Sequence, residues 1–281
     1  MDSLPKCFVI TIETDGARSR SAVRQLNSIG LDFEFVEGCL PDDPLVSASY
    51  DKTLNYRCMK RPLSFGEVAV YLSHRRAMGT FLKTDAEVAL VLEDDFGLLD
   101  PDHFIEDVTM ISRAPIRWDL LKLFDFQGPK RPRACLDLGR VSIVEYNSPT
   151  AGMVGYLVRR SGAEKLITRP ILFRTIDEDT KLYWELDLYA YSALPNLITE
   201  ISHELGGSTL ESERQRLRDD RSTGRSFRGM GIKFARRWHH FLNRERYSLG
   251  AAMDAYARHS ADRPDAHDEV RGPAMMSGSQ Q

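Results

Sequence analysis

The hydrophobic pattern of the chain alternates between short apolar runs and longer stretches with helical spacing. Residues 7–12 form a β-branched run that predicts a strand, and residues 33–36 predict a second strand. Between them, apolar positions from Ala22 to Ile29 recur at helical spacing, and Gly30 is a suitable helix end. A strand, a helix and a strand in this order are typical of α/β proteins with parallel strands.

The chain repeats this alternation to about residue 200. Ser64 and Glu67 form an S-x-x-E capping box ahead of apolar positions at helical spacing, and Ser161 and Glu164 form a second one. We interpret residues 41–62 and 127–140 as irregular loops, the first of them long enough to be functional. The pattern also predicts a helix at 98–111 and strands at 88–92, 118–124, 150–158 and 195–199. We therefore expect an α/β fold with a mostly parallel central sheet.

Three carboxylates follow the predicted strand at 88–92. This strand reads Val-Ala-Leu-Val-Leu and leads directly into Glu93, Asp94 and Asp95. In an open α/β sheet, ligands bind beyond the carboxyl ends of the strands. Glu93 and Asp95 share one side of an extended chain, so both are able to reach one Mg²⁺ or Mn²⁺. A solvated acidic turn is the competing interpretation.

Basic residues lie at two further positions of interest. Arg18 and Arg20 occur where the first strand passes into its helix, which is a usual place for phosphate contacts. His74 lies on the helix that Ser64 opens. Surface arginines and a structural histidine are the alternative interpretations, and for each residue taken alone they are the commoner ones.

A second acidic region spans residues 177–187. It contains Asp179, Glu185 and Asp187, and the apolar residues from Leu182 to Leu188 alternate with more polar ones. His203 lies just beyond the last predicted strand. Two separate acidic groups suit different tasks, because one is able to hold a metal with phosphates while the other accepts a proton.

The composition is that of a soluble globular protein. The chain has 281 residues, 42% of them hydrophobic, and a formal net charge of −3, which argues against a general nucleic-acid binder. The four cysteines form no C-x-x-C pair, and neither a signal peptide nor a membrane-spanning run is recognised. We expect a cytoplasmic protein that binds no nucleic acid.

The C-terminal part differs in character from the rest of the chain. Residues 212–247 contain eleven Lys/Arg and four Asp/Glu, a local net charge of +7 (11 − 4), interleaved with large apolar residues. We favour peripheral binding to an anionic membrane, on the inner face of the cytoplasmic membrane. Packing on the core and nucleic-acid binding are the alternatives. We divide the chain into a catalytic domain (1–210), a basic amphipathic segment (211–260) and a disordered tail (261–281).

Several of these motifs occur in an order that resembles glycosyltransferase family 25, which contains lipooligosaccharide and collagen galactosyltransferases. The resemblance covers roughly residues 7–210, on the bacterial branch. The motifs that carry it are Leu-Ser-Phe-Gly-Glu at 63–67, Leu-Ser-His at 72–74, Val-Leu-Glu-Asp-Asp at 91–95, Trp-Asp at 118–119 and the stretch 155–166. Arg18 occupies the place of an arginine after the family's first strand, and Thr11 stands where the family commonly has Asn.

The resemblance implies a nucleotide-sugar-binding fold of the GT-A type and an inverting, metal-dependent transfer. The donor would be a UDP-sugar, with galactose or a related hexose as the sugar. The acceptor would be a lipid-linked or oligosaccharide precursor of lipopolysaccharide, lipooligosaccharide or exopolysaccharide. Mn²⁺ or Mg²⁺ would be held by Glu93, Asp95 and His203, and the donor by Thr11, Arg18, His74 and Asp94. Asp187 is the first choice for the base, followed by Glu185 and Asp179.

Two alternatives belong to other classes. A metal-dependent nucleotidyl- or phosphotransferase would use the same acids, but the sequence has no Walker-type phosphate loop. A degenerate sugar- or partner-binding protein without turnover would be expected to lose the acidic triplet, which is intact here.

Overall fold

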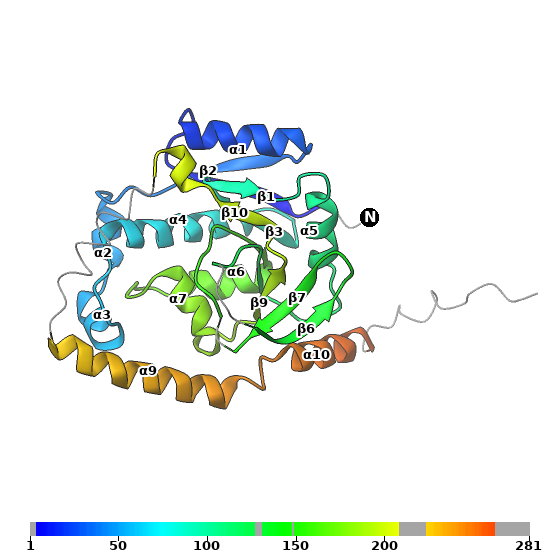
Figure 1. The fold of residues 1–281 in the computed structure, drawn as a ribbon. Coiled ribbons are helices and arrows are strands. Elements are labelled where there is room, and N and C mark those ends of the chain that lie inside the picture. Colours follow the sequence, from blue (N-terminus) through cyan, green and yellow to red (C-terminus); the bar gives the residue numbers. More distant parts are fainter. Residues whose placement is uncertain (1–3, 127–130, 148, 208–222, 262–281) are drawn as a thin grey trace, which may run out of the picture.

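The computed structural model describes residues 4–126, 131–147, 149–207 and 223–261 (Figure 1). The strands are β1 (Lys6–Thr11), β2 (Phe33–Glu37), β3 (Val88–Glu93), β4 (Phe96–Leu98), β5 (Leu120–Lys122), β6 (Pro132–Asp137), β7 (Ser142–Tyr146), β8 (Gly155–Arg159), β9 (Ala190–Leu194) and β10 (Ile198–Glu200). The helices are α1 (Ala17–Ser28), α2 (Pro44–Ser49), α3 (Lys52–Cys58), α4 (Phe65–Phe81), α5 (Phe104–Ser112), α6 (Arg160–Ile167), α7 (Ile176–Lys181), α9 (Thr223–Asn243) and α10 (Leu249–Ala261), with short 3₁₀ turns η1 (Tyr183–Glu185) and η2 (Ser202–Leu205).

A central sheet organises the part of the chain that the structure describes. Its strand order is β2-β1-β3-β8-β5-β9-β7-β6, and β4 pairs separately with β10. The pairings of neighbours show that β8 and β7 run against the other six strands of this sheet. The α/β class with a mostly parallel central sheet is therefore confirmed.

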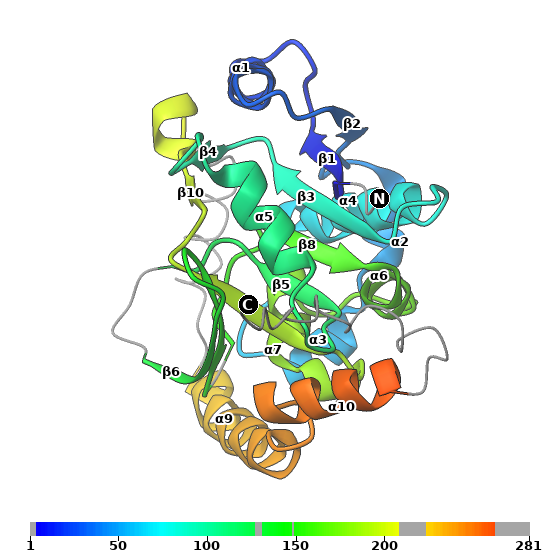
Figure 2. The ribbon, with the colours of Figure 1, turned by 90° about the vertical axis from the view of Figure 1, so that its right-hand side faces the viewer.

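Helices cover both faces of the sheet. Figure 2 shows α4 and α6 on one side of the sheet and α5 on the other. The predicted strand–helix–strand unit is present as β1, α1 and β2, with β1 parallel to both β2 and β3. Strands β1 and β3 are almost fully buried, which explains their continuous apolar sequences. Their carboxyl ends, Thr11 and Glu93, lie at the same edge of the sheet.

The helix α4 begins as its sequence predicts. The Ser64 hydroxyl accepts from the Glu67 backbone N–H at 3.0 Å, and the Glu67 carboxylate accepts from the Ser64 N–H at 3.1 Å. The second predicted capping box is wrong. The Ser161 hydroxyl donates instead to Asp119 Oδ1 at 2.5 Å, and α6 begins at Arg160 without a side-chain cap. A buried carboxylate nearby competes successfully for the serine.

Two segments interpreted as loops contain regular structure. Residues 41–62 form α2 and α3, whose first turns are capped by Asp43, which accepts from Leu45 N–H, and by Asp51, which accepts from Leu54 N–H. In the basic stretch, residues 127–130 lie outside the described residues, and Pro132–Asp137 forms the edge strand β6. Gly139, with a φ of +101°, makes the turn that pairs β6 with β7.

Other elements refine the prediction. The expected helix at 98–111 is divided into the end of β4 and the helix α5. The alternating residues 182–188 form η1 and a turn, in which Leu182, Tyr183 and Leu188 are buried. Strand β9 precedes the predicted last strand, which is β10.

The C-terminal helices close one side of the molecule (Figure 1). Tyr247, Leu249 and Ala252 are buried and belong to the hydrophobic core, so the chain after α9 packs on the rest of the α/β fold. Residues 208–222 lie outside the described residues, as does the tail predicted to be disordered at 261–281, apart from Ala261, which ends α10. Among the described residues, no helix is both long and apolar enough to cross a membrane.

Candidate active site

The predicted donor residues and two of the three predicted metal ligands, Glu93 and Asp95, come together at the carboxyl ends of β1 and β3. Ile10 pairs with Glu93 across these parallel strands, so Thr11 and the acidic triplet occupy one corner of the sheet. Arg18 reaches the same corner from the first turn of α1. His74 reaches it from the middle of α4. Residues from four parts of the chain therefore meet where the sequence predicted a ligand site.

Asp94 is held firmly on both of its carboxylate oxygens. The Thr11 hydroxyl donates to Asp94 Oδ2 at 2.7 Å, and Arg18 Nη1 donates to Oδ1 at 3.3 Å. Burial raises the pKa of Asp94, and these two contacts oppose the rise. Asp94 therefore fixes the strand end and orients Arg18.

Asp95 is paired on one side alone. Arg18 Nη1 donates to Asp95 Oδ2 at 3.1 Å, while Oδ1 is buried and has no hydrogen-bond partner among the described residues. Burial, followed by the charge of Glu93, raises the pKa of Asp95 to about 7, although Arg18 opposes this. A buried carboxylate oxygen of this kind favours a further cation.

Glu93 is oriented by a chain of two buried side chains. His74 Nε2 lies 3.2 Å from Glu93 Oε1, and His74 Nδ1 lies 3.0 Å from the Tyr156 hydroxyl. If the tyrosine hydroxyl donates to Nδ1, then Nε2 carries the proton that His74 donates to Glu93. Tyr156 is fully buried, and burial raises its pKa well above the ordinary value, so its hydroxyl stays protonated.

The donor set at this corner fits a hard divalent cation. Glu93 and Asp95 offer carboxylate oxygens, and the orphaned Asp95 Oδ1 is an available ligand atom. Among the described residues no group of three or more His, Cys, Asp and Glu side chains is arranged to hold a metal. A cation bound here would thus have two carboxylates from the protein and would take the rest of its ligands from water and substrate phosphates, as Mg²⁺ commonly does.

His203 lies on η2, the short turn that follows β10 in the chain, and its side chain is exposed. The strand before it, β10, pairs with β4, and Ile201 N–H donates to the Asp95 carbonyl at 2.8 Å. The structure brings the His203 segment close to the triplet without placing its side chain in a three-ligand group.

The second acidic region does not join the triplet. Asp179 is fully buried. Its carboxylate lies 2.8 Å from Arg174 Nε and 3.0 Å from Arg169 Nε, and it accepts a hydrogen bond of 2.5 Å from the Tyr71 hydroxyl. Glu185 pairs with the same two arginines. These contacts engage both acids in one ion-pair network, in which Asp179 is buried and Glu185 is partly exposed.

Asp187 lies at the opposite edge of the sheet from Glu93. It precedes β9, whose first residue is in line with Leu120 of β5, Val158 of β8 and Ala89 of β3. Four residues along a strand and three strand spacings separate Ala190 from Glu93, roughly 20 Å, and Asp187 comes three residues before Ala190. Its Oδ1 accepts from Arg246 at 2.9 Å and from the Tyr247 hydroxyl at 2.8 Å. We therefore do not assign Asp187 the role of base.

Three residues of the corner were missed in the sequence. The sequence around Tyr156 predicts a buried strand, and the tyrosine hydroxyl is the feature that could have indicated a polar role there. Glu200 ends β10, and its charge contributes to the raised pKa of Asp95. Gly207 accepts from Arg18 Nη2 at 2.7 Å through its carbonyl oxygen, a contact that no sequence pattern reveals.

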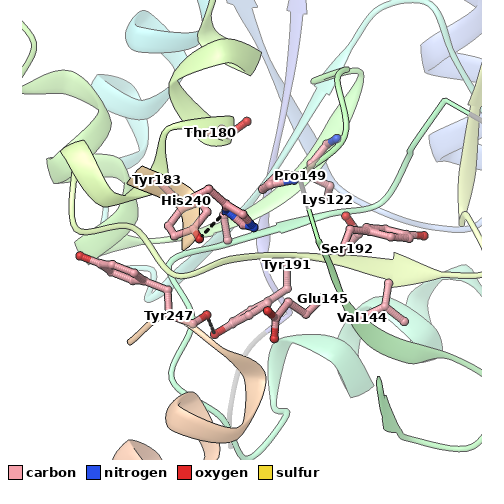
Figure 3. A pocket seen from close by; sticks show the side chains of 12 residues that line it. Lys122, Val144, Glu145, Pro149, Thr180, Tyr183, Tyr191, Ser192, His240 and Tyr247 are labelled. Atoms are coloured by element: carbon pink, nitrogen blue, oxygen red, sulfur yellow. Dashed lines mark hydrogen bonds between the residues drawn. The ribbon is translucent and has the colours of Figure 1, made fainter. Parts of the chain in front are cut away.

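A narrow pocket lies away from this corner, between β7, β9, α7 and α9 (Figure 3). Lys122, Glu145, Tyr183, Tyr191 and His240 are among the residues that line it. Its volume of about 20 Å³ is enough for a water molecule and too small for a sugar. The pocket is therefore a feature of packing beneath α9.

Comparison with known proteins gives a consistent family. Residues 4–171 match the model of glycosyltransferase family 25, described as an LPS biosynthesis protein family. Human procollagen galactosyltransferase 2 is 24% identical over 223 residues, which are 68% of this chain and 34% of that protein. A glycosyltransferase 25 family member from Aedes aegypti is 27% identical over 186 residues, 61% of this chain and 29% of that protein.

The chain spans about a third of the length of these curated relatives. A solved glycosyltransferase involved in glycosylation of the major capsid of PBCV-1 aligns with a TM-score of 0.37 and 10% identity, covering 82% of this chain and all of that one. The family match includes β1, α1, α4 and β3, the elements that bring Thr11, Arg18, His74 and the acidic triplet to the corner. Since this match covers more than half of its residues, the chain belongs to glycosyltransferase family 25.

Proposed function

We propose that the protein is a metal-dependent glycosyltransferase that moves a hexose from a UDP-sugar to an oligosaccharide or lipid-linked acceptor. Family membership supports the reaction class. The observation that carries the metal and donor assignment is Asp95, whose buried Oδ1 has no partner beside a second carboxylate, Glu93. Galactose is the sugar that the human relative's name suggests.

The donor diphosphate is proposed to lie between the acidic triplet and the start of α1. Glu93 and Asp95 would hold Mn²⁺ or Mg²⁺, which when bound neutralises the diphosphate of the departing nucleotide. The first turn of α1 contains Arg18, lacks acids and has no side-chain cap, so its backbone N–H groups favour an anion. Arg18 already touches Asp94 and Asp95, and its guanidinium is able to share its donors with a phosphate.

The remaining residues of the corner hold these groups in place. Thr11 and Asp94 fix the turn after β3, and His74 with Tyr156 fixes Glu93. Such fixed orientation of ligand carboxylates raises metal affinity, because less freedom is lost on binding. We propose direct, inverting displacement at the anomeric carbon, which needs a base near the acceptor hydroxyl.

The acceptor is proposed to be a precursor of lipopolysaccharide, lipooligosaccharide or exopolysaccharide. The description of the family supports this class of acceptor. A lipid-linked acceptor would require the enzyme to work at a membrane surface. The acceptor hydroxyl has to approach the open side of the corner, where Glu93 is partly exposed.

The test is release of UDP from a panel of UDP-hexoses, measured with Mn²⁺, with Mg²⁺ and after chelation. We expect release with one or a few donors, abolished by chelator and restored by added metal. Release that is indifferent to chelator would remove the metal from the proposal. Tight binding of a donor without release, even with oligosaccharide acceptors, would favour a binding protein without turnover.

A further inference from the structure

The helix α9 presents two distinct faces along its length. Its positions toward the core are Gly229, Ile232, Arg236 and His240, which recur at helical spacing and are buried or half-buried. Arg236 Nη2 donates to Glu178 Oε2 at 2.6 Å, and His240 Nδ1 lies 2.9 Å from the Tyr183 hydroxyl. These contacts attach α9 to α7 and η1, so the orientation of the helix on the molecule is fixed.

The opposite face carries large apolar side chains exposed to solvent. We call these residues the apolar stripe: Met230, Phe234, Trp238, Phe241 and Leu242. Phe234 is 73% exposed, and the other four are each more than half exposed. Scattered exposed apolar residues are normal, but five along one face of a single helix form a continuous patch of the kind that marks an interaction surface.

The charges of α9 favour one kind of partner. The helix contains five Lys/Arg and no Asp/Glu, in a chain whose formal net charge is −3. Lys233 and Arg237 are one helical turn apart, both are exposed, and they flank the apolar stripe. Arg236 is occupied by Glu178, whereas neither Lys233 nor Arg237 forms an ion pair within the described residues. Large apolar side chains flanked by basic ones suit an anionic bilayer, where the apolar groups enter the headgroup boundary and the cations meet lipid phosphates.

We propose that α9 is a membrane-docking helix, which seats the protein on an anionic lipid bilayer through the apolar stripe and the flanking Lys233 and Arg237. This inference does not depend on the metal or on the donor. The membrane binding expected for residues 212–247 is thereby limited to particular residues on one face of α9. Residues 212–222 lie outside the described part. Figure 1 shows α9 along one side of the molecule, next to α3 and α7, and no other described helix or strand is drawn on its outer side.

The experiment is co-sedimentation of the full chain with vesicles of phosphatidylcholine alone and of phosphatidylcholine mixed with phosphatidylglycerol. We expect binding to the mixed vesicles at low salt and weaker binding at high salt. The variant Phe234→Ser/Trp238→Ser/Phe241→Ser should lower the partition coefficient on mixed vesicles at least about tenfold. The variant Lys233→Gln/Arg237→Gln should lower it roughly fivefold for each charge removed, on mixed vesicles alone.

The matched control is Leu45→Ser/Leu99→Ser, which removes two exposed apolar side chains from other parts of the surface and should leave binding unchanged. Equal binding by the stripe variant and the wild type would overturn the proposal. A wild-type protein that ignores both vesicles but forms a dimer that the stripe variant cannot form would also overturn it, in favour of a second copy as the partner. Circular dichroism and thermal unfolding of each variant show whether it is folded.

Discussion

At the scale of single residues, the candidate site is shaped by the unequal pairing of its three acids. Asp94 is engaged on both oxygens, Glu93 is oriented by His74, and Asp95 keeps one buried oxygen without a partner. The sequence predicted that these residues and Arg18 would meet, because strand ends and helix starts share an edge in α/β folds. It did not predict which acid is unpaired, since this depends on contacts between distant segments.

Asp95→Asn should abolish metal-dependent UDP release, with a loss of at least about 100-fold, because the proposed ligand charge is removed. The metal-free variant should unfold at a temperature no lower than the wild type, since the amide no longer carries a charge in a buried place. UDP release and thermal unfolding are the measurements. Asp102→Asn, an exposed acid outside the site, is the control and should keep full activity. Full activity in Asp95→Asn would contradict the assignment.

Tyr156→Phe should weaken Mn²⁺ binding by about tenfold, because His74 loses the hydroxyl that fixes its ring and thereby the orientation of Glu93. Calorimetric titration of Mn²⁺ in the presence of UDP measures this effect. Tyr191→Phe removes another buried hydroxyl, one that donates to the Tyr247 carbonyl far from the triplet. An equal loss of affinity in both variants would show that Tyr156 acts through general stability.

At the scale of helices and strands, the sequence predicted the presence of an element better than the residue at which that element begins. The capping box of α4 was predicted correctly because Ser64 and Glu67 satisfy each other locally. Ser161 failed as a cap because Asp119, distant in sequence, takes its hydroxyl. The caps Asp43 and Asp51 were available in the sequence, but their short helices lack the long apolar stripe that predicts a helix.

Gly155→Ala tests the packing of β8 between its neighbours. A Cβ at this position would overlap Ile198 Cδ1 and lie 2.8 Å from Leu92 Cδ2, so the variant should lose about 1–3 kcal/mol of unfolding free energy. Urea unfolding measures it. Ile198→Val removes the nearer methyl group, so the double variant should be more stable than the sum of the two single losses predicts. Strict additivity would contradict this explanation.

The attachment of α9 should depend on pH through Glu178. Burial works against the charged form, but Lys181 and Arg236 outweigh it and hold the pKa of Glu178 below its ordinary 4.5, with Asp177 acting in the opposite sense. An acid whose pKa is lowered by folding contributes stability above its unfolded pKa and loses it as pH falls through the lowered value. Protection of α9 amides, corrected for intrinsic exchange, should therefore fall below pH 4.5.

Glu178→Gln is the matched variant for this pH dependence. It should show lower protection of α9 already at neutral pH, and the step below pH 4.5 should be smaller than in the wild type. Hydrogen exchange read by mass spectrometry resolves α9 from the core. An unchanged step in Glu178→Gln would assign the pH dependence to another group.

At the scale of the whole molecule, the proposed catalytic site and the proposed membrane-docking helix lie in separate parts of the chain. The corner of β1, α1, α4 and β3 lies within the family match, whereas α9 lies beyond its last residue. The apolar-stripe variant should therefore keep UDP release within about twofold of the wild type while losing vesicle binding. If the variant loses UDP release together with vesicle binding, α9 supports the fold of the site. The packing of Tyr247 and Leu249, just after α9, into the core is the reason to test this alternative.

Thermal unfolding with each UDP-hexose, with and without Mn²⁺, for the wild type and Asp95→Asn, decides whether this corner binds metal and donor. A ligand at a hundred times its dissociation constant stabilises the native state by about 2.7 kcal/mol. We predict a rise in the unfolding temperature of roughly 5 °C with one donor, present with Mn²⁺ in the wild type and absent in Asp95→Asn. The same rise without Mn²⁺, or in Asp95→Asn, would contradict a metal and donor site at this corner.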